Sequence, residues 1–232
     1  MRRDRRRCRR AAATVVLALA ATAAPARAQQ ESLEIVPTVG ILIPTGTLTR
    51  GVVTPPGGIP VPLAISQETG PLVGARVTAW WSTDWGWEVR FDQAYGDAEV
   101  EGEGVGSFCD GAGELECGAN VWIASSRVLR RFGLGPGAPW SLHAGLGVTV
   151  VGHTGEFWRR GEATTDLGLS AGLGVALELS QRLALRLDAD DHVYRFRPEI
   201  RDDPVLGTVD SGQRLQNDVV VSVAVAIQLH GR

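Results

Sequence analysis

Few side chains in this sequence are spaced for catalysis, and the best placed are Ser141 and His143. They lie two positions apart, so both point to the same side of an extended strand. A hydrolase needs a serine beside a histidine and an acid, and Asp166 and Ser170 follow on the next extended segment. We interpret Ser141 and His143 as interior packing residues and predict no catalytic site.

The acidic run 188-DADD-191 is a second candidate, because alternating acids begin a calcium-binding loop. An EF-hand also needs a glycine and a distal glutamate, and this run lacks both. Its acids are therefore predicted to form salt bridges. We expect neither a metal ion nor a cofactor.

The N-terminus has the three parts of a secretory signal peptide. Residues 2–10 are basic, residues 11–24 are apolar but too short to span a bilayer comfortably, and Ala26-Arg27-Ala28 is a small-residue cleavage site. We predict cleavage after Ala28, which divides the chain into a signal peptide at 1–28 and one domain at 29–232. The alternative is a short N-terminal anchor.

The predicted mature chain is strongly acidic. The first 28 residues contain eight of the 23 basic residues and one of the 26 acids, which leaves 15 arginines against 25 acids and a net charge of −10. The chain has no lysine. This charge balance argues against nucleic acid as a partner. No later segment has eighteen consecutive apolar residues, so no transmembrane helix is expected.

Two cysteines remain after the signal peptide, Cys109 and Cys117, with seven residues between them. An exported chain enters an oxidising compartment, so a loop disulfide is predicted. A zinc site would need further nitrogen or sulfur ligands, and no histidine lies nearby.

Apolar and polar residues alternate with a period of two along eight segments, which predicts eight β-strands. Most segments have 11–14 residues, which is longer than typical soluble strands and long enough for a tilted strand of about 9–11 residues to cross a bilayer. The predicted strands are 33–44, 72–82, 85–95, 119–132, 140–151, 166–179, 182–196 and 218–230.

The connections between these segments alternate between long and short along the whole chain. Residues 83–84 and 180–181 are the shortest links, whereas 45–70 and 197–217 are among the long ones. This order puts all long loops at one end, as in an up-and-down transmembrane barrel with short periplasmic turns and longer external loops.

The two faces of the predicted strands differ in character. In 182–196, Leu183, Leu185 and Leu187 share one face, and the opposite face is charged. Elsewhere that second face is rich in glycine, alanine and serine, which suits the narrow interior of an eight-stranded barrel. A soluble lipocalin-like barrel, with its apolar face inside, is the alternative. We predict a buried charge network made of Arg76, Glu88, Arg90, Asp92, Glu178, Arg186, Asp188 and Asp190.

Aromatic residues gather near both ends of the predicted strands, as in the interfacial girdles of membrane barrels. The alternative is that the tryptophans are core anchors of a soluble sheet. The predicted girdle residues are Trp80, Trp81, Trp85, Trp87 and Trp140 at one end, with Tyr95 and Tyr194 at the other.

The whole mature chain resembles the small outer-membrane β-barrels of Gram-negative bacteria, the OmpA-, OmpX- and OmpW-like families. The segments 34-EIVPTVGILIPTG-46 and 183-LALRLDADDHVYRF-196 and the rhythm of the loops carry the likeness. The resemblance implies an all-β, eight-stranded antiparallel up-and-down barrel in the outer membrane, in contact with lipids and lipopolysaccharide. It also implies insertion by the barrel-assembly machinery, and a monomer is expected. Such barrels usually end on an aromatic residue that the assembly machinery reads, whereas this sequence ends LHGR. Either the usual signal is missing or Leu229 supplies it in a divergent form.

The resemblance implies a structural or surface-interaction role through the external loops. Two alternatives remain open, a narrow conduit for small or hydrophobic solutes and an enzyme that modifies outer-membrane lipids. For the enzyme, the His-x-Ser order of the related hydrolases is absent, because Ala144 and Gly145 follow His143.

Overall fold

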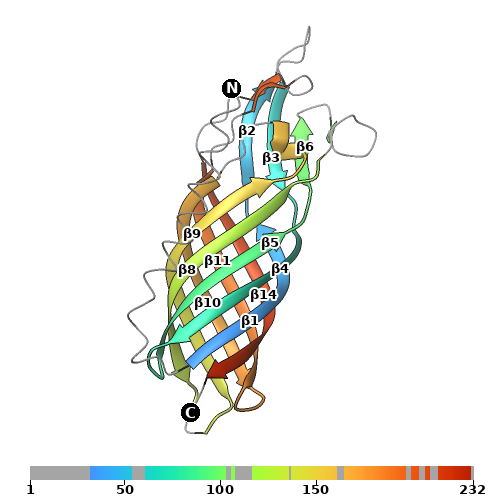
Figure 1. The fold of residues 1–232 in the computed structure, drawn as a ribbon. Helices are drawn as coiled ribbons and strands as arrows, with labels where there is room; N and C mark the ends of the chain where they lie inside the picture. The colour runs from blue at the N-terminus through green and yellow to red at the C-terminus, as the bar shows by residue number, and fades with distance from the viewer. Residues whose placement is uncertain are drawn as a thin grey trace, which may run out of the picture.

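Eight long strands form a closed antiparallel barrel in the computed structural model (Figure 1). The structure describes residues 32–53, 61–102, 106–107, 117–135, 137–160, 165–196, 200–203, 207–209 and 214–230. The barrel strands are β1 (Ser32–Pro44), β4 (Gly70–Trp80), β5 (Trp85–Ala94), β8 (Asn120–Gly133), β9 (Trp140–Thr154), β10 (Thr165–Glu178), β11 (Leu183–Phe196) and β14 (Arg214–His230). Each predicted strand corresponds to one of these, so the predicted barrel is confirmed.

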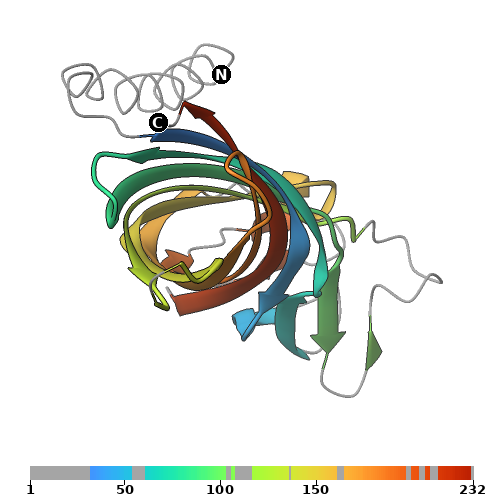
Figure 2. The same ribbon diagram turned by 90° about the horizontal axis from the view of Figure 1, so that it is seen from below.

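The barrel closes because the first strand pairs on both sides. β1 is antiparallel to β14 and also to β4, which gives the order β1-β14-β11-β10-β9-β8-β5-β4. Figure 2, seen along the barrel from below, shows the closed ring of strands. Closure leaves no barrel strand with an unpaired edge. Within the described residues, no helix has the length and apolar character needed to cross a membrane.

All long connections emerge at one end of the barrel. At the opposite end, the strands are joined by the short links 81–84, 134–139 and 179–182, of which the structure describes all but residue 136. The long connections contain β2 (Thr47–Val53), β3 (Val61–Gln67), β6 (Ala98–Gly102), β7 (Gly106–Ser107), the 3-10 helix η2 (Phe157–Arg160), β12 (Ile200–Asp203) and β13 (Gly207–Val209). We call these the loop end and the short-turn end. β2, β3, β6 and β7 form a second sheet that extends beyond the barrel (Figure 1).

The outer surface of the barrel is apolar. Leu167 and Leu173 on β10 are 73% and 68% exposed, and the β11 leucines at 183, 185 and 187 also face outward. On β8, Trp122, Ala124, Val128 and Phe132 take the outward register. Arg130 shares that face, and its guanidinium lies 5.3 Å from the centre of the Trp85 ring. Its position near the short-turn end keeps the charge away from the middle of the apolar surface.

The girdle prediction is wrong for two residues, because their side chains lie inside the barrel. Trp80 is 3% exposed and Tyr194 is 1% exposed. Trp80 has the same strand parity as Arg76, and Tyr194 has the same parity as Asp190, so both must point inward. Trp81, Trp85, Trp140 and Tyr95 are exposed, and Trp87 is half-buried with its indole N–H donating to Ser126 Oγ at 2.8 Å.

Candidate functional site: the charged interior of the barrel

Eight charged side chains fill the middle of the barrel, and none is more than 3% exposed. Four are arginines and four are carboxylates, so their formal charges balance. They belong to β4, β5, β8 and β11, and we refer to them as the charge network. Its members are Arg76, Arg90, Arg127 and Arg186 with Glu88, Asp92, Asp188 and Asp190.

Asp190 joins three arginines from three different strands. Its Oδ2 accepts from Arg76 Nη2 at 3.2 Å and from Arg90 Nη1, and its Oδ1 accepts from Arg127 Nη1. Arg90 Nε also donates to Asp92, within the same strand. One carboxylate on β11 is therefore tied to β4, β5 and β8 on the far side of the ring.

Glu88 is a second centre, nearer the short-turn end. Its carboxylate accepts from Thr78 Oγ1 at 3.0 Å, from Arg127 Nε at 2.8 Å and from Arg186 Nη1 at 3.2 Å. Glu88 and Arg127 are direct cross-strand neighbours between β5 and β8. A fully buried carboxylate needs partners of this kind, because an unpaired buried charge is costly.

His143 belongs to the charge network through Asp188 and Arg186. Its Nε2 contacts Asp188 Oδ1 and lies 2.9 Å from Arg186 Nη2. Asp188 is also within 3.0 Å of Arg76 Nη1. The Nε2 nitrogen of His143 therefore contacts one acidic and one basic member of the charge network.

Glycines on β10 provide the space for the charge network. A Cβ added at Gly172 would collide with Asp190 and Arg127, and one at Gly174 would collide with Asp188 and His143. Both glycines point inward by strand parity. The small inward residues of this strand, which the sequence analysis assigned to a narrow interior, let long arginine side chains reach across it.

The structure brings together seven of the eight residues predicted for the network and excludes Glu178. Glu178 is exposed at the end of β10, one layer beyond the charge network, so its placement was wrong. Arg127 was missed because β8 carries arginine or serine on both faces, at Ser125, Ser126 and Arg130, which obscures the alternation. Its position opposite Glu88 was the signal that could have identified it.

Apolar and aromatic side chains close the interior at the loop end. Phe157 and Trp158 of η2 pack with Phe196 of β11 in one buried cluster, which also contains Val121, Ile123, Val151 and Val220. The His153 ring lies 4.5 Å from the Phe196 ring. Beneath this plug, Tyr194 donates its hydroxyl to Asp218 Oδ2 at 2.7 Å.

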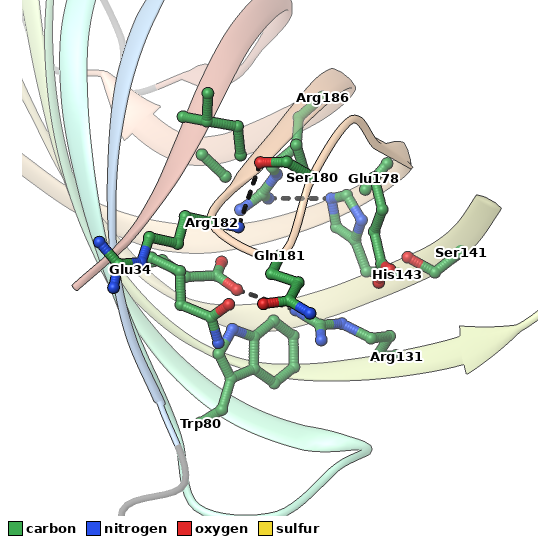
Figure 3. A pocket seen from close by; sticks show the side chains of 15 residues that line it. Glu34, Trp80, Arg131, Ser141, His143, Glu178, Ser180, Gln181, Arg182 and Arg186 are labelled. Atoms are coloured by element: carbon green, nitrogen blue, oxygen red, sulfur yellow. Dashed lines mark hydrogen bonds and ion pairs between the residues drawn. The ribbon is translucent and has the colours of Figure 1, made fainter. Parts of the chain in front are cut away.

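A pocket of about 170 Å³ lies at the short-turn end (Figure 3). Its inner wall is formed by His143 and Arg186 of the charge network. Arg131 stacks over Trp80, with 3.8 Å from its guanidinium carbon to the ring centre, and pairs with Glu34 at 3.1 Å. The pocket therefore ends at the charge network and does not pass through it.

The described residues test neither the expectation that the protein has no cofactor nor the predicted disulfide. They contain no group of three or more histidines, cysteines or acids arranged to hold a metal ion. Cys117 is described, but Cys109 lies outside the described residues, so the disulfide stays a prediction. The signal peptide at 1–28 also lies outside them.

This barrel has an apolar outer surface and a charged middle, the reverse of a soluble lipocalin-like barrel, whose apolar face is inside. This arrangement is stable when lipid covers the outer surface, because the leucines then contact hydrocarbon and the charges are paired within the lumen. The fold and interior thus define an eight-stranded transmembrane β-barrel.

Comparisons with protein-family models and with curated protein sequences give no match. Among solved structures, the chain is similar to the outer-membrane protein OprG from Pseudomonas aeruginosa, at 12% identity and a TM-score of 0.64, covering 88% of this chain and 98% of that chain. The N-terminal barrel domain of Pseudomonas aeruginosa OprF is 11% identical, with a TM-score of 0.48, and covers 86% and 98% of the two chains. The predicted resemblance to small outer-membrane barrels is confirmed at the level of the fold.

Proposed function

We propose that the protein is an integral outer-membrane barrel whose loop end has a structural or surface-interaction role. The inverted surface pattern and the OprG-like fold support the membrane location. The closed ring has no free edge through which copies could pair, which supports a monomer. We also propose insertion by the barrel-assembly machinery, which the class of fold supports.

The observation that carries this proposal is the sheet at the loop end. Two connections far apart in the sequence build it, since Ile65 of β3 lies opposite Val100 of β6. One face packs into the buried cluster that closes the barrel, through Leu48, Leu63 and Ile65. The loop end is therefore a platform held in place by the barrel core, as a surface for interactions requires.

The packed interior supports this role over a conduit for solutes. A solute entering from the short-turn pocket would meet Arg186 and His143, then the charge network, and then the apolar plug. Passage would require ion pairs among buried side chains to separate, which is costly.

Labelling of single cysteines tests the location and the orientation together. Val52 on β2 is 51% exposed at the loop end, and Leu134 is 56% exposed at the short-turn end. In intact cells, a membrane-impermeant maleimide should label Val52→Cys and leave Leu134→Cys unlabelled until the outer membrane is permeabilised. The unchanged protein, with its own Cys109 and Cys117, sets the background. Labelling of Leu134→Cys alone would reverse the orientation, and release of both variants as soluble protein would refute the proposal.

We also propose that the barrel has no catalytic role, because His143 is bound to Asp188 and Arg186. Lipid A from cells that express the protein should keep the acyl chains of lipid A from cells without it, as measured by mass spectrometry. Loss or gain of an acyl chain that disappears in His143→Asn would overturn this and restore the enzyme alternative.

A further inference from the structure

The pocket at the short-turn end, which we call the short-turn pocket, is a blind cup in the mouth of the barrel. Residues of β1, β4, β8, β9, β10, β11 and β14 line it, and His143 and Arg186 of the charge network close it on the inner side. Its volume of about 170 Å³ corresponds to about five or six water molecules at roughly 30 Å³ each. The short-turn pocket is therefore sized for one small molecule.

The turn at 179–182 forms one wall of the short-turn pocket and is held in place by hydrogen bonds. The main-chain N–H of Ser180 donates to the Leu183 carbonyl at 3.1 Å, and the main-chain N–H of Arg182 donates to Ser180 Oγ at 3.3 Å. The Arg182 carbonyl accepts from the main-chain N–H of Gln228 on β14 at 2.9 Å. The side chains of Gln181 and Arg182, which both line the pocket, therefore project from a fixed turn. A ligand gains from such a wall because the wall need not be ordered on binding.

The charges that line the short-turn pocket balance. Glu34 pairs with Arg131 at 3.1 Å, and Arg186 belongs to the charge network, whose own charges cancel. The remaining two, Glu178 and Arg182, are exposed and carry one charge of each sign. Within the part of the chain that the structure describes, neither of them forms an ion pair. This balance favours a neutral ligand, because an anion would meet two carboxylates in the pocket and a cation would meet three guanidinium groups.

Hydrogen-bonding groups of both kinds remain open to a ligand in the short-turn pocket. Trp80 is 3% exposed, and among the described residues its buried indole N–H has no hydrogen-bond partner, which is costly unless a ligand supplies one. Figure 3 shows Trp80, Arg131 and Gln181 gathered at one side of the pocket. A ligand with several hydroxyl groups matches this lining, because each hydroxyl can donate to a carboxylate and accept from an N–H group.

We propose that the short-turn pocket binds one sugar ring, either a free monosaccharide or the end unit of a glycan chain. The indole N–H of Trp80 donates to one hydroxyl of the ring, Gln181 and Arg182 bind hydroxyls at the mouth, and Glu178 accepts from another. The ligand class does not depend on the role proposed for the loop end. Only the compartment from which the sugar enters, the periplasm, rests on the proposed orientation.

Nuclear magnetic resonance of the folded full chain tests the proposal, with glucose as the probe, nitrogen-15 in the tryptophans and a detergent that has no sugar group. The indole N–H signal of Trp80, identified by its loss in Trp80→Phe, is expected to shift as glucose is added. The indole N–H of Trp158 is the internal control, because it is also buried without a described partner but lies in the plug at the loop end. Its signal should not move.

Two arginine variants and the salt concentration test the contacts of the sugar. Arg182→Gln is expected to bind glucose about tenfold more weakly, because it loses a charged donor at the mouth of the pocket. Arg130→Gln is the matched control, since Arg130 is an exposed arginine on the outer surface of the same end, and it should bind glucose as the unchanged protein does. Raising the salt concentration should change the dissociation constant by less than about twofold, because the ligand is neutral.

Three results would overturn the proposal. They are a Trp80 signal that glucose does not move, an equal shift of the Trp158 signal, or much tighter binding of glucuronate that is lost in high salt, which would indicate an anion site. A glucose trisaccharide distinguishes the two sources of the sugar, and both outcomes retain the sugar site. Binding equal to that of glucose identifies the end unit of a glycan, and exclusion of the trisaccharide identifies a free monosaccharide.

Folding is checked separately by the shift in gel mobility between unheated and boiled samples. An unchanged protein without that shift would refute the proposed function, whereas a normal shift without glucose binding would refute the sugar site alone.

Discussion

Replacement of Asp190 with asparagine is expected to lower the free energy of unfolding of the barrel by about 3–5 kcal/mol. Asp190 accepts from Arg76, Arg90 and Arg127, and all four side chains are buried. The substitution keeps the shape but removes the negative charge at the point where three positive charges converge. Unfolding in urea, followed by loss of the fast-migrating unboiled band, measures the change.

Glu178→Gln is the matched control for Asp190→Asn, because it also neutralises an acid but lies outside the charge network. Its exposed position at the end of β10 predicts a change within about 0.5 kcal/mol. If the two variants were equally stable, the buried ion pairs would not hold the barrel together, and the charge network would be a passive filler.

A double variant separates lost charge balance from lost packing. Arg127→Gln combined with Asp190→Asn leaves three arginines and three carboxylates in the charge network. Because the two side chains contact each other, the double variant should lose less stability than the sum of the two single variants. Simple addition of the two losses would indicate that Asp190 acts through its other partners.

The strand faces were predictable because a period of two is a local property of the chain. Leu183, Leu185 and Leu187 alternate with charges over one short segment, and nothing beyond that segment is needed to assign their side. The errors at Trp80 and Tyr194 arose where nearness to a turn was given more weight than parity. Parity counted from Arg76 and from Asp190 places both residues inside.

The partners of Asp190 were not predictable from the sequence. Its neighbours in the sheet are β10 and β14, yet its arginines come from β4, β5 and β8. Only the small diameter of an eight-stranded ring brings these strands within reach of one carboxylate. Closure of the ring is a property of the whole chain, so no local pattern reports it.

The sheet at the loop end was also outside the reach of the sequence analysis, which treated 45–70 as a single loop. β3 pairs with β6, about 35 residues further along the chain, from Leu63↔Gly102 to Gln67↔Ala98. The two connections can pair because both lie at the loop end of the closed barrel. Short strands such as β6, with five residues, also give too few alternations to stand out.

Replacement of Leu173 with arginine is expected to destabilise the barrel in lipid vesicles by about 2–4 kcal/mol. Leu173 is 68% exposed near the middle of β10, and its direct cross-strand neighbours, Ala144 and Ala189, carry no charge. The nearest outward acid is Asp191, which lies one diagonal step away on β11. An arginine there must lie in hydrocarbon or bend toward an interface. The free energy of unfolding in vesicles, measured against urea, reports the cost.

Leu173→Ala is the control, because it shortens the same side chain without adding a charge. It should cost much less than the arginine variant, since Leu173 packs mainly against lipid and leaves no cavity in the interior when it is cut back. Arg130 shows that the outer surface accepts an arginine near its edge, where Trp85 and Phe132 flank the guanidinium. If Leu173→Arg and Leu173→Ala had the same free energy of unfolding, a charge in the middle of the outer surface would not destabilise the barrel. The leucines would then face water, and the assignment of the outer surface to lipid would have to be abandoned.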